Sequence, residues 1–309
     1  MSLQTSTAKV PPSAPPGAPP KSGGYLRIMD RWLAPVLVTC ILVVGHLAYG
    51  ITEAQNSPLL ARLTGGWVTS YSPTFVAILT AVLAELVLSR LMVGKWPFLP
   101  SAYISGISVG ILIRSTLLWP YILCSLISIV SKYALRWRGR HLWNPSNFGV
   151  SVLLFLAPVV VAPLSVQWSN QFWPLLVIWC LGTMTLYRLG RLHITLTYVT
   201  AFLLLAPLRS MLTGHNLLAE IAPITGPMYQ LYIFFMITDP KTTPRTKRAQ
   251  ILVTILIAVA EVGFRWARQV DAPFYALFVV GPTANAIGIW WQGRQAKAAA
   301  QRQGAGVGV

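Results

Sequence analysis

Charge is scarce in this sequence, and negative charge is scarcest of all. Only 10% of the 309 residues are charged, and seven are Asp or Glu, whereas soluble domains average roughly 25% charged residues. So few charged groups cannot coat the surface of a water-soluble protein of this size, which excludes an ordinary soluble enzyme. With 55% hydrophobic residues, the chain is also unlike disordered proteins, which are poor in apolar side chains.

Cysteine and histidine are also rare. The three cysteines (Cys40, Cys124 and Cys180) lie in separate apolar runs, and only four histidines accompany them. No CxxC motif or Cys/His cluster is present, so we expect no metal site. Nor do we find a hydrolytic triad, a phosphate-binding loop or a pair of carboxylates with catalytic spacing, and we therefore assign no catalytic residue.

Long apolar runs are what the sequence has in abundance. Such runs predict membrane-spanning helices rather than the alternating pattern of a membrane barrel. The sequence therefore predicts an all-α, polytopic integral membrane protein with about ten transmembrane helices. The predicted spans are residues 32–51, 68–88, 102–113, 117–135, 148–163, 172–187, 194–208, 228–237, 251–264 and 273–291.

The distribution of positive charge orients these spans. The net charge is +17, but the basic residues lie in short loops rather than on one soluble face, so we expect no nucleic-acid partner. With both termini placed in the cytoplasm, 19 of the 24 Lys and Arg residues fall on the cytoplasmic side. This imbalance follows the positive-inside rule and supports ten spans with both termini cytoplasmic.

The chain divides into three predicted regions. Residues 1–30 form a disordered, Pro-rich cytoplasmic tail that contains VPPSAPPGAPPK, a stiff polyproline arm that could dock on an aromatic groove. Residues 31–292 form the transmembrane helical domain, for which the lipid bilayer is the main partner. Residues 293–309 form a polar cytoplasmic C-terminal tail.

Three of the predicted spans are too short to cross a bilayer as straight helices. Residues 102–113, 194–208 and 228–237 fall below the 17–25 residues that a crossing helix needs, and Gly or Pro residues interrupt or flank them. Such segments are typical of broken helices that line an internal site, although tilted helices would explain them equally well. Ten spans also divide as five plus five, which is compatible with an inverted repeat, but no internal sequence repeat is visible.

Two cytoplasmic loops combine Asn or Asp, Pro and several cations. They are RWRGRHLWNPSNFG (136–149) and MITDPKTTPRTKR (236–248). Asn144-Pro145 reads as a helix N-cap followed by a first-turn proline, and Asp239-Pro240 and Thr243-Pro244 repeat the pattern. Helix ends with nearby cations could bind a phosphate or carboxylate group, or could simply cap helices and attract lipid headgroups. The candidate cofactor-binding residues are Arg138, Arg140, Asn144, Asn147, Asp239, Lys241, Thr242 and Thr243.

These loops carry a resemblance to a known family. The segments KWPFLPSAYISGISVGILIR and SKYALRWRGRHLWNPSNFGVSVLLFLAP, the run FFMITDPKTTP, and APFYALFVVGPTANA with Asn285 occur in the order seen in the RnfD/NqrB family. That family comprises the flavin-carrying membrane subunits of the Rnf complex and of the sodium-pumping NADH:quinone reductase. The resemblance implies a subunit of a redox or electron-transfer system in a bacterial inner membrane, with other membrane or redox subunits as partners.

The sequence departs from this family at the flavin attachment site. The family attaches FMN covalently to a Thr in a Ser-Gly-Ala-Thr motif, whereas this chain has PVVVAPLSVQWSNQF in that region. In this respect it looks more like the shorter UnbU-type members. We therefore expect FMN, riboflavin or a quinone-like group to bind non-covalently, if any does. A small-solute transporter or channel on the same fold, with Glu85, Asn147 and Asn285 lining the path, and a membrane anchor for a partner enzyme are the alternatives.

Two acidic residues within the predicted spans have predicted partners. Glu85 lies near the inner end of its span, where we expect it to pair with Arg90 or a loop arginine. Glu261 and Arg265 are four residues apart on one predicted helix, which is the spacing of a helical ion pair.

Overall fold

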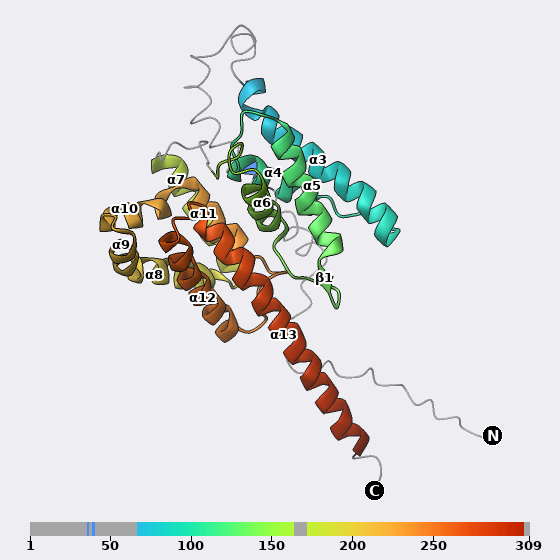
Figure 1. The fold of residues 1–309 in the computed structure, drawn as a ribbon. Coiled ribbons are helices and arrows are strands. Elements are labelled where there is room, and N and C mark those ends of the chain that lie inside the picture. Colours follow the sequence, from blue (N-terminus) through green and yellow to red (C-terminus); the bar gives the residue numbers. More distant parts are fainter. Residues whose placement is uncertain (1–35, 37–38, 41–66, 164–171, 306–309) are drawn as a thin grey trace, which may run out of the picture.

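The computed structural model describes residues 36, 39–40, 67–163 and 172–305 of the chain, and these residues are mostly helical (Figure 1). Helices α3 to α6 pack together as one group and α7 to α12 as another. Helix α13 starts against both α6 and α12, then runs on beyond the rest of the fold (Figure 1). The helices are α3 (Trp67–Val93), α4 (Pro100–Leu112), α5 (Trp119–Ala134), α6 (Pro145–Leu156), α7 (Phe172–Arg188), α8 (Leu192–Leu204), α9 (Ala206–Thr213), α10 (Leu217–Ile221), η2 (Ala222–Thr225), α11 (Pro227–Leu231), η3 (Tyr232–Met236), α12 (Lys247–Trp266) and α13 (Ala272–Ala305).

Glycine permits the close packing of the first group of helices. A β-carbon on Gly106 of α4 would lie 2.5 Å from the Cα of Ile78 on α3, and one on Gly149 of α6 would lie 2.0 Å from Ser128 Oγ on α5. Such distances are far inside van der Waals contact, so only glycine fits at these crossings. Small residues at helix crossings are typical of membrane proteins, where backbones approach closely to gain van der Waals contact.

The second group contains two interrupted helices. Helices α8 and α9 bend by 43° at their junction, where Pro207 cannot donate the hydrogen bond that would continue α8. Helix α11 passes directly into η3, a single turn of π-helix over Tyr232–Met236. The prediction of a broken helix is therefore confirmed for residues 194–208. The predicted span 102–113 corresponds to the 13-residue helix α4, which ends at Leu112.

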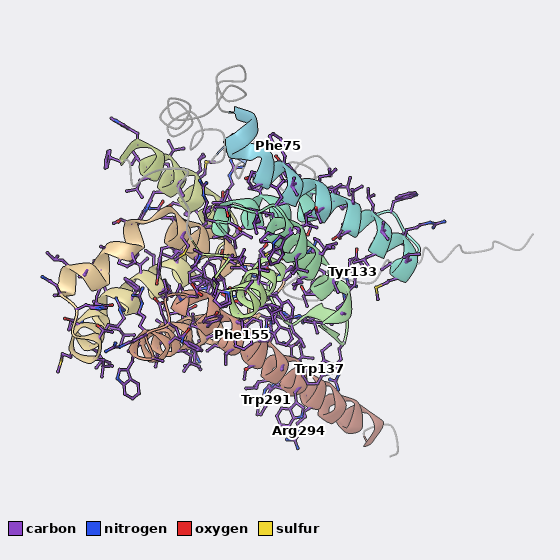
Figure 2. All side chains as sticks on the ribbon, turned by 45° about the horizontal axis from the view of Figure 1, so that its top comes forward. Phe75, Tyr133, Trp137, Phe155, Trp291 and Arg294 are labelled. Atoms are coloured by element: carbon purple, nitrogen blue, oxygen red, sulfur yellow. The ribbon has the colours of Figure 1, made fainter. Side chains whose placement is uncertain are left out.

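The long helices have the length and apolar character of membrane spans. Within the described residues, Pro73–Val93, Lys247–Trp266 and Ala272–Gln295 are long and apolar enough to cross a bilayer, and the bent pair α8–α9 would add a fourth. Large apolar side chains point outward from this body: Phe75, Phe155 and Trp291 are 66%, 76% and 56% exposed (Figure 2). Such outward apolar side chains are compatible with a lipid environment.

Nine of the ten predicted apolar segments overlap helices, although α6 ends at Leu156, well short of the predicted end of the 148–163 segment. The remaining segment, residues 32–51, lies almost entirely outside the described residues. The structure differs from the expectation of a purely helical chain in one loop. Strands β1 (Arg136–Trp137) and β2 (Arg140–His141) form a short antiparallel hairpin, and its turn residues Arg138 and Gly139 have φ values of 50° and 78°. Positive φ at both turn residues is the signature of a type I′ hairpin turn.

The structure extends helix into the C-terminal region and corrects two of the three predicted helix caps. The predicted polar tail 293–309 continues α13 as helix through Ala305. Asn144 caps α6 as expected, accepting a hydrogen bond from the Asn147 backbone N–H. The prediction of further caps at Asp239 and Thr243 was wrong, because α12 begins later and is capped by Thr246.

Candidate functional site

The two loops singled out in the sequence meet in the folded protein. The Asn144 side-chain amide donates a hydrogen bond to Asp239 Oδ2 at 3.1 Å. Arg140, on β2, donates to the Thr243 carbonyl at 3.5 Å. Residues about 100 positions apart in the sequence therefore share one site. The sequence had indicated this only through the similar composition of the two loops.

Asp239 organises the second loop. Its Oδ1 accepts from the Lys241 backbone N–H at 3.0 Å, and its Oδ2 accepts from the Thr242 hydroxyl at 3.1 Å. Its backbone carbonyl accepts from the Thr243 hydroxyl at 2.8 Å, and Arg191 also hydrogen-bonds to that hydroxyl. The Thr-Asp-Pro motif thus forms a tight turn whose carboxylate faces the first loop.

Two buried asparagines fasten both loops to α13. Asn285 on α13 donates its side-chain amide to the carbonyls of Leu142 and Thr242, at 3.1 and 2.6 Å. Asn147 on α6 donates to the Phe274 carbonyl at 3.3 Å. Because these donors pair with backbone carbonyls, both asparagines act as fasteners of the loops in this structure.

A cavity of about 510 Å³ lies between the loops and helices α4, α5 and α7. One wall is apolar and includes Ile104, Leu186 and the π-helical segment Phe234–Met236. The rest of the lining is largely polar. It includes Ser101, Ser105, Lys132, His141, Asn144, Ser146, Thr238, Asp239 and Lys241.

The cavity has the size and lining of a small-molecule site. Pockets for small ligands usually measure roughly 300–1,000 Å³ and combine apolar walls with a few polar groups. A small apolar cavity of about 20 Å³ adjoins it and shares Ile104, Ser108, Phe235 and Met236 with it. The arrangement suits an amphiphilic or planar ligand with one polar edge.

A buried ion pair contributes to the polar lining. Lys132 Nζ donates to Glu85 Oε2 at 2.9 Å, and the side chains are 6% and 10% exposed. The Tyr133 hydroxyl donates to the other oxygen of Glu85 at 3.1 Å. The prediction that Glu85 pairs with Arg90 or a loop arginine was wrong. Arg90 lies at the exposed end of α3 and donates to the Gly94 carbonyl at 3.0 Å. The two helices α3 and α5 lie side by side and offer Glu85 a buried lysine instead.

His141 lies beside this ion pair. Burial, with Arg136 and Lys241 nearby, lowers the pKa of its imidazole to about 4, so the ring is neutral at pH 7. Its Nδ1 is buried and has no hydrogen-bond partner within the described part of the chain. A neutral imidazole with a free ring nitrogen can donate to, or accept from, a polar ligand atom.

The eight predicted site residues divide into two groups. Asn144, Asp239 and Lys241 line the cavity. The other five do not line it: Arg138, Arg140, Asn147, Thr242 and Thr243. All of these except Arg138 make hydrogen bonds within the two loops, between them or to α13. Arg138 is exposed at the hairpin turn and stands over the Trp137 ring, while Thr242 is buried beneath Asp239.

Sequence reasoning missed Lys132 and His141 as lining residues. Lys132 had been counted only among the basic residues that mark cytoplasmic helix ends. The sequence did contain a signal for the pairing of Lys132 with Glu85. Lys132 lies in the last turn of the apolar helix α5, and a carboxylate within a predicted span requires a nearby cation. Nothing in the sequence marked His141, whose position follows from the hairpin.

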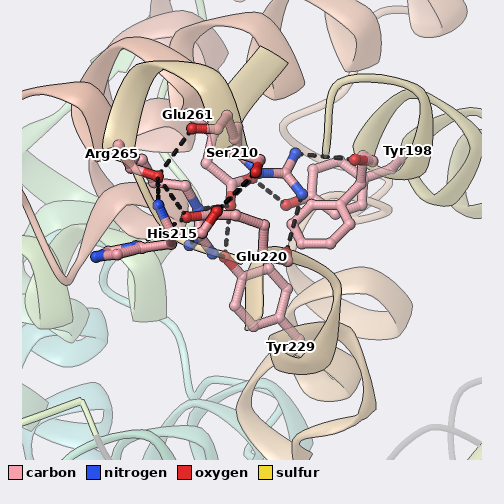
Figure 3. Close-up of polar contacts among 10 residues, drawn as sticks. Tyr198, Ser210, His215, Glu220, Tyr229, Glu261 and Arg265 are labelled. Carbon is pink, nitrogen blue, oxygen red and sulfur yellow. Dashed lines mark hydrogen bonds and ion pairs between the residues drawn. The ribbon is translucent and has the colours of Figure 1, made fainter. Parts of the chain in front are cut away.

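A second polar cluster lies between α8, α9, α10, α11 and α12 (Figure 3). Glu261 accepts from the Tyr198 hydroxyl at 2.5 Å, from Arg265 Nε at 3.0 Å, and from the Tyr229 hydroxyl. The predicted helical pair of Glu261 and Arg265 is therefore confirmed. Arg265 also reaches Glu220 Oε2 at 3.5 Å, which connects the two carboxylates.

Arg209 completes this cluster. Its guanidinium donates to Glu220 Oε2 at 3.2 Å, to the Glu220 carbonyl at 3.0 Å and to the Phe202 carbonyl at 2.8 Å, and it lies 3.9 Å from the centre of the Phe202 ring. Glu220 also accepts from Thr213 and from the exposed His215. Two arginines thus balance two glutamates in a protein interior, where unpaired charge would be costly.

No family model matches this chain, and no curated protein sequence matches it. Among the described residues, no three His, Cys, Asp or Glu side chains lie close enough together to hold a metal ion.

Proposed function

We propose that this protein is a membrane-embedded subunit of a redox or electron-transfer system similar to RnfD/NqrB, and that its cavity binds a flavin or quinone-like group non-covalently. The proposal includes ten spans, a five-plus-five repeat, both termini in the cytoplasm of a bacterial inner membrane, and further membrane or redox subunits as partners. The observation that carries it is the cavity of about 510 Å³. Both of the loops that bear the resemblance line that cavity.

The residues present fit such a group. Phe234, Phe235 and Ile104 provide an apolar wall for a planar ring system. Lys132 and His141 provide polar contacts for ring carbonyls or nitrogens, and the exposed Lys241 lies where a phosphate could be held. When bound, a flavin or quinone-like group supplies electron-carrying chemistry that the side chains of this protein lack. The protein's own residues bind and orient the ring and exclude water from it.

The first experiment is an absorbance spectrum of the detergent-purified protein before and after acid denaturation. We expect a flavin or quinone band that acid releases into the supernatant, because no covalent attachment motif is present. Direct binding is then tested by titrating ligand-free protein with riboflavin and with menadione, with tryptophan fluorescence as the readout.

A variant that fills the cavity provides the structural control. Ser108 lines both cavities, so Ser108→Phe is expected to abolish binding. Thr283 is exposed on α13, so Thr283→Phe adds the same ring elsewhere and should bind normally. A colourless protein that binds neither compound, with or without its partner subunits, would refute the proposal.

One observation favours a second function, transport of a small solute. Helices α8 and α9 form a broken span, and the buried cluster of Figure 3 stands beside the break. Broken helices with intramembrane ionisable groups are typical of transporters. This alternative predicts solute flux in proteoliposomes that Glu261→Gln abolishes, and a protein without a chromophore.

A further inference from the structure

The Lys132–Glu85 pair has a geometry beyond that of an ordinary stabilising ion pair. Lys132 is one of the residues that line the cavity, and its amine donates to Glu85 on α3, which is not among the lining residues. The Tyr133 hydroxyl contacts the far oxygen of Glu85 at 3.1 Å. Tyr133 is only partly buried, and Arg136 packs on its ring. A continuous row of hydrogen bonds therefore runs from the protein surface at Tyr133 to the cavity.

We propose that Glu85 and Lys132 form a proton-transfer pair that delivers protons from the surface at Tyr133 to a ligand in the cavity. This inference rests on the proposed function, because it requires a ligand with a basic oxygen or nitrogen near Lys132. The ligand class is a carbonyl-bearing ring whose oxygen becomes basic when the ring carries negative charge.

The step balances without any redox change in the protein. The Lys132 Nζ–H bond breaks as an O–H or N–H bond forms on the ligand, which leaves a neutral amine. Glu85 takes a proton from water by way of the Tyr133 hydroxyl and passes it to that amine. The pair then returns to its starting charges, and one proton has moved from water to the ligand.

Lysine is suited to this role and arginine is not. A buried lysine amine can lose its proton, whereas a guanidinium remains protonated in proteins. The other charged or titratable groups near Lys132 come from β1, β2 and the loop after η3: Arg136, His141, Asp239 and Lys241. Among them Asp239 is already held by Asn144, Thr242 and Lys241, which leaves Glu85 as the carboxylate in direct contact with Lys132.

The test uses the full-length protein in nanodiscs loaded with 2-hydroxy-1,4-naphthoquinone, a coloured acid whose anion and neutral form absorb differently. A rapid drop in pH is followed by the rate at which the bound dye becomes protonated. We expect Lys132→Met and Glu85→Gln to slow this rate on the order of 100-fold, the usual contribution of a positioned proton donor. The protonation rate in Lys132→Arg should be as slow as in Lys132→Met, and the rate in Glu85→Asp should lie between those of Glu85→Gln and the wild type.

Two further variants separate proton transfer from folding and binding. Tyr133→Phe removes only a hydroxyl at the surface end and should slow the rate about tenfold, and Lys247→Met, at the exposed start of α12, should leave it unchanged. If all Lys132 and Glu85 variants that still bind the dye protonate it at the wild-type rate, the proton-transfer proposal is overturned and the proposed function stays intact. Failure of the wild-type protein to bind this dye, riboflavin and menadione would instead overturn the proposed function.

Discussion

The buried pair of Arg209 and Glu220 predicts a large and measurable loss of stability. Arg209 is 1% exposed and makes three hydrogen bonds, two of them to Glu220. Arg209→Met removes all three hydrogen bonds. Glu220 then keeps only the more distant ion pair with Arg265, at 3.5 Å, as its contact with an arginine. Breaking a buried ion pair in this way costs about 3–5 kcal/mol, which corresponds to a fall of about 10 °C in Tm.

A double-mutant cycle tests whether the pair itself is responsible. Glu220→Gln alone should also destabilise the protein, because Arg209 then lacks a carboxylate partner. The double variant should be more stable than the sum of the single effects implies, by about 1–3 kcal/mol, since removal of the second charge relieves the unpaired first one.

The assay is thermal unfolding of detergent-solubilised protein, followed by circular dichroism, at fixed detergent and salt concentrations. Arg188→Met serves as the matched control, because Arg188 is exposed at the end of α7 and its loss should change stability by less than about 0.5 kcal/mol. If Arg209→Met changes stability by no more than this control, or if the two single effects simply add, the reasoning about the buried cluster is wrong.

Three further predictions follow from glycine packing, loop fastening and histidine titration. Gly149→Ala places a methyl group 2.0 Å from Ser128 Oγ and should destabilise by about 1–3 kcal/mol, whereas Gly263→Ala, with open space around it, should be neutral or stabilising in thermal unfolding. Asn285→Ala removes two donors to the loops and should cost about 1–3 kcal/mol and weaken riboflavin binding; normal binding would contradict the fastening role. The pKa of His141 falls from about 6.5 in unfolded chains to about 4 in the folded protein, so stability is lost as the pH falls through that window. His141→Asn should therefore flatten the pH dependence of Tm between these values, and an unchanged slope would contradict the assignment.

Apolar runs predicted the helices well because hydrophobic segments must be helical to satisfy their backbone in a membrane. Asn144 also behaved as predicted, since an N-cap followed by proline is a local signal that tertiary structure seldom overrides. The cap expected at Asp239 failed for a tertiary reason. Its carboxylate is hydrogen-bonded to Asn144 and to its own turn, so the helix starts only after Thr246.

Partners distant in the sequence were the least predictable part of the site. Glu85 and Lys132 are 47 residues apart, and their pairing depends on how closely α3 and α5 pack. The relative rotation of two helices decides which side chains meet, and the sequence does not show that rotation. For the same reason His141 could not be assigned to the cavity wall, since its direction depends on the positive φ values of the hairpin turn.

The single π-helical turn has a consequence for insertions and deletions. Tyr232, its first residue, packs against the rings of Tyr198 and Tyr229 in the buried cluster, while Phe234, Phe235 and Met236 line the cavity. A π-turn contains one residue more than the α-helical turn that it replaces, and each residue of an α-helix rotates the chain by about 100°. Deleting one residue here would therefore convert the π-turn into an α-helical turn and leave the later side chains of the segment in their present orientation. A deletion in the preceding α-helix α11 would instead rotate Tyr229 relative to the cavity wall by about 100°, so the segment tolerates the loss of a residue in the π-turn better than in α11.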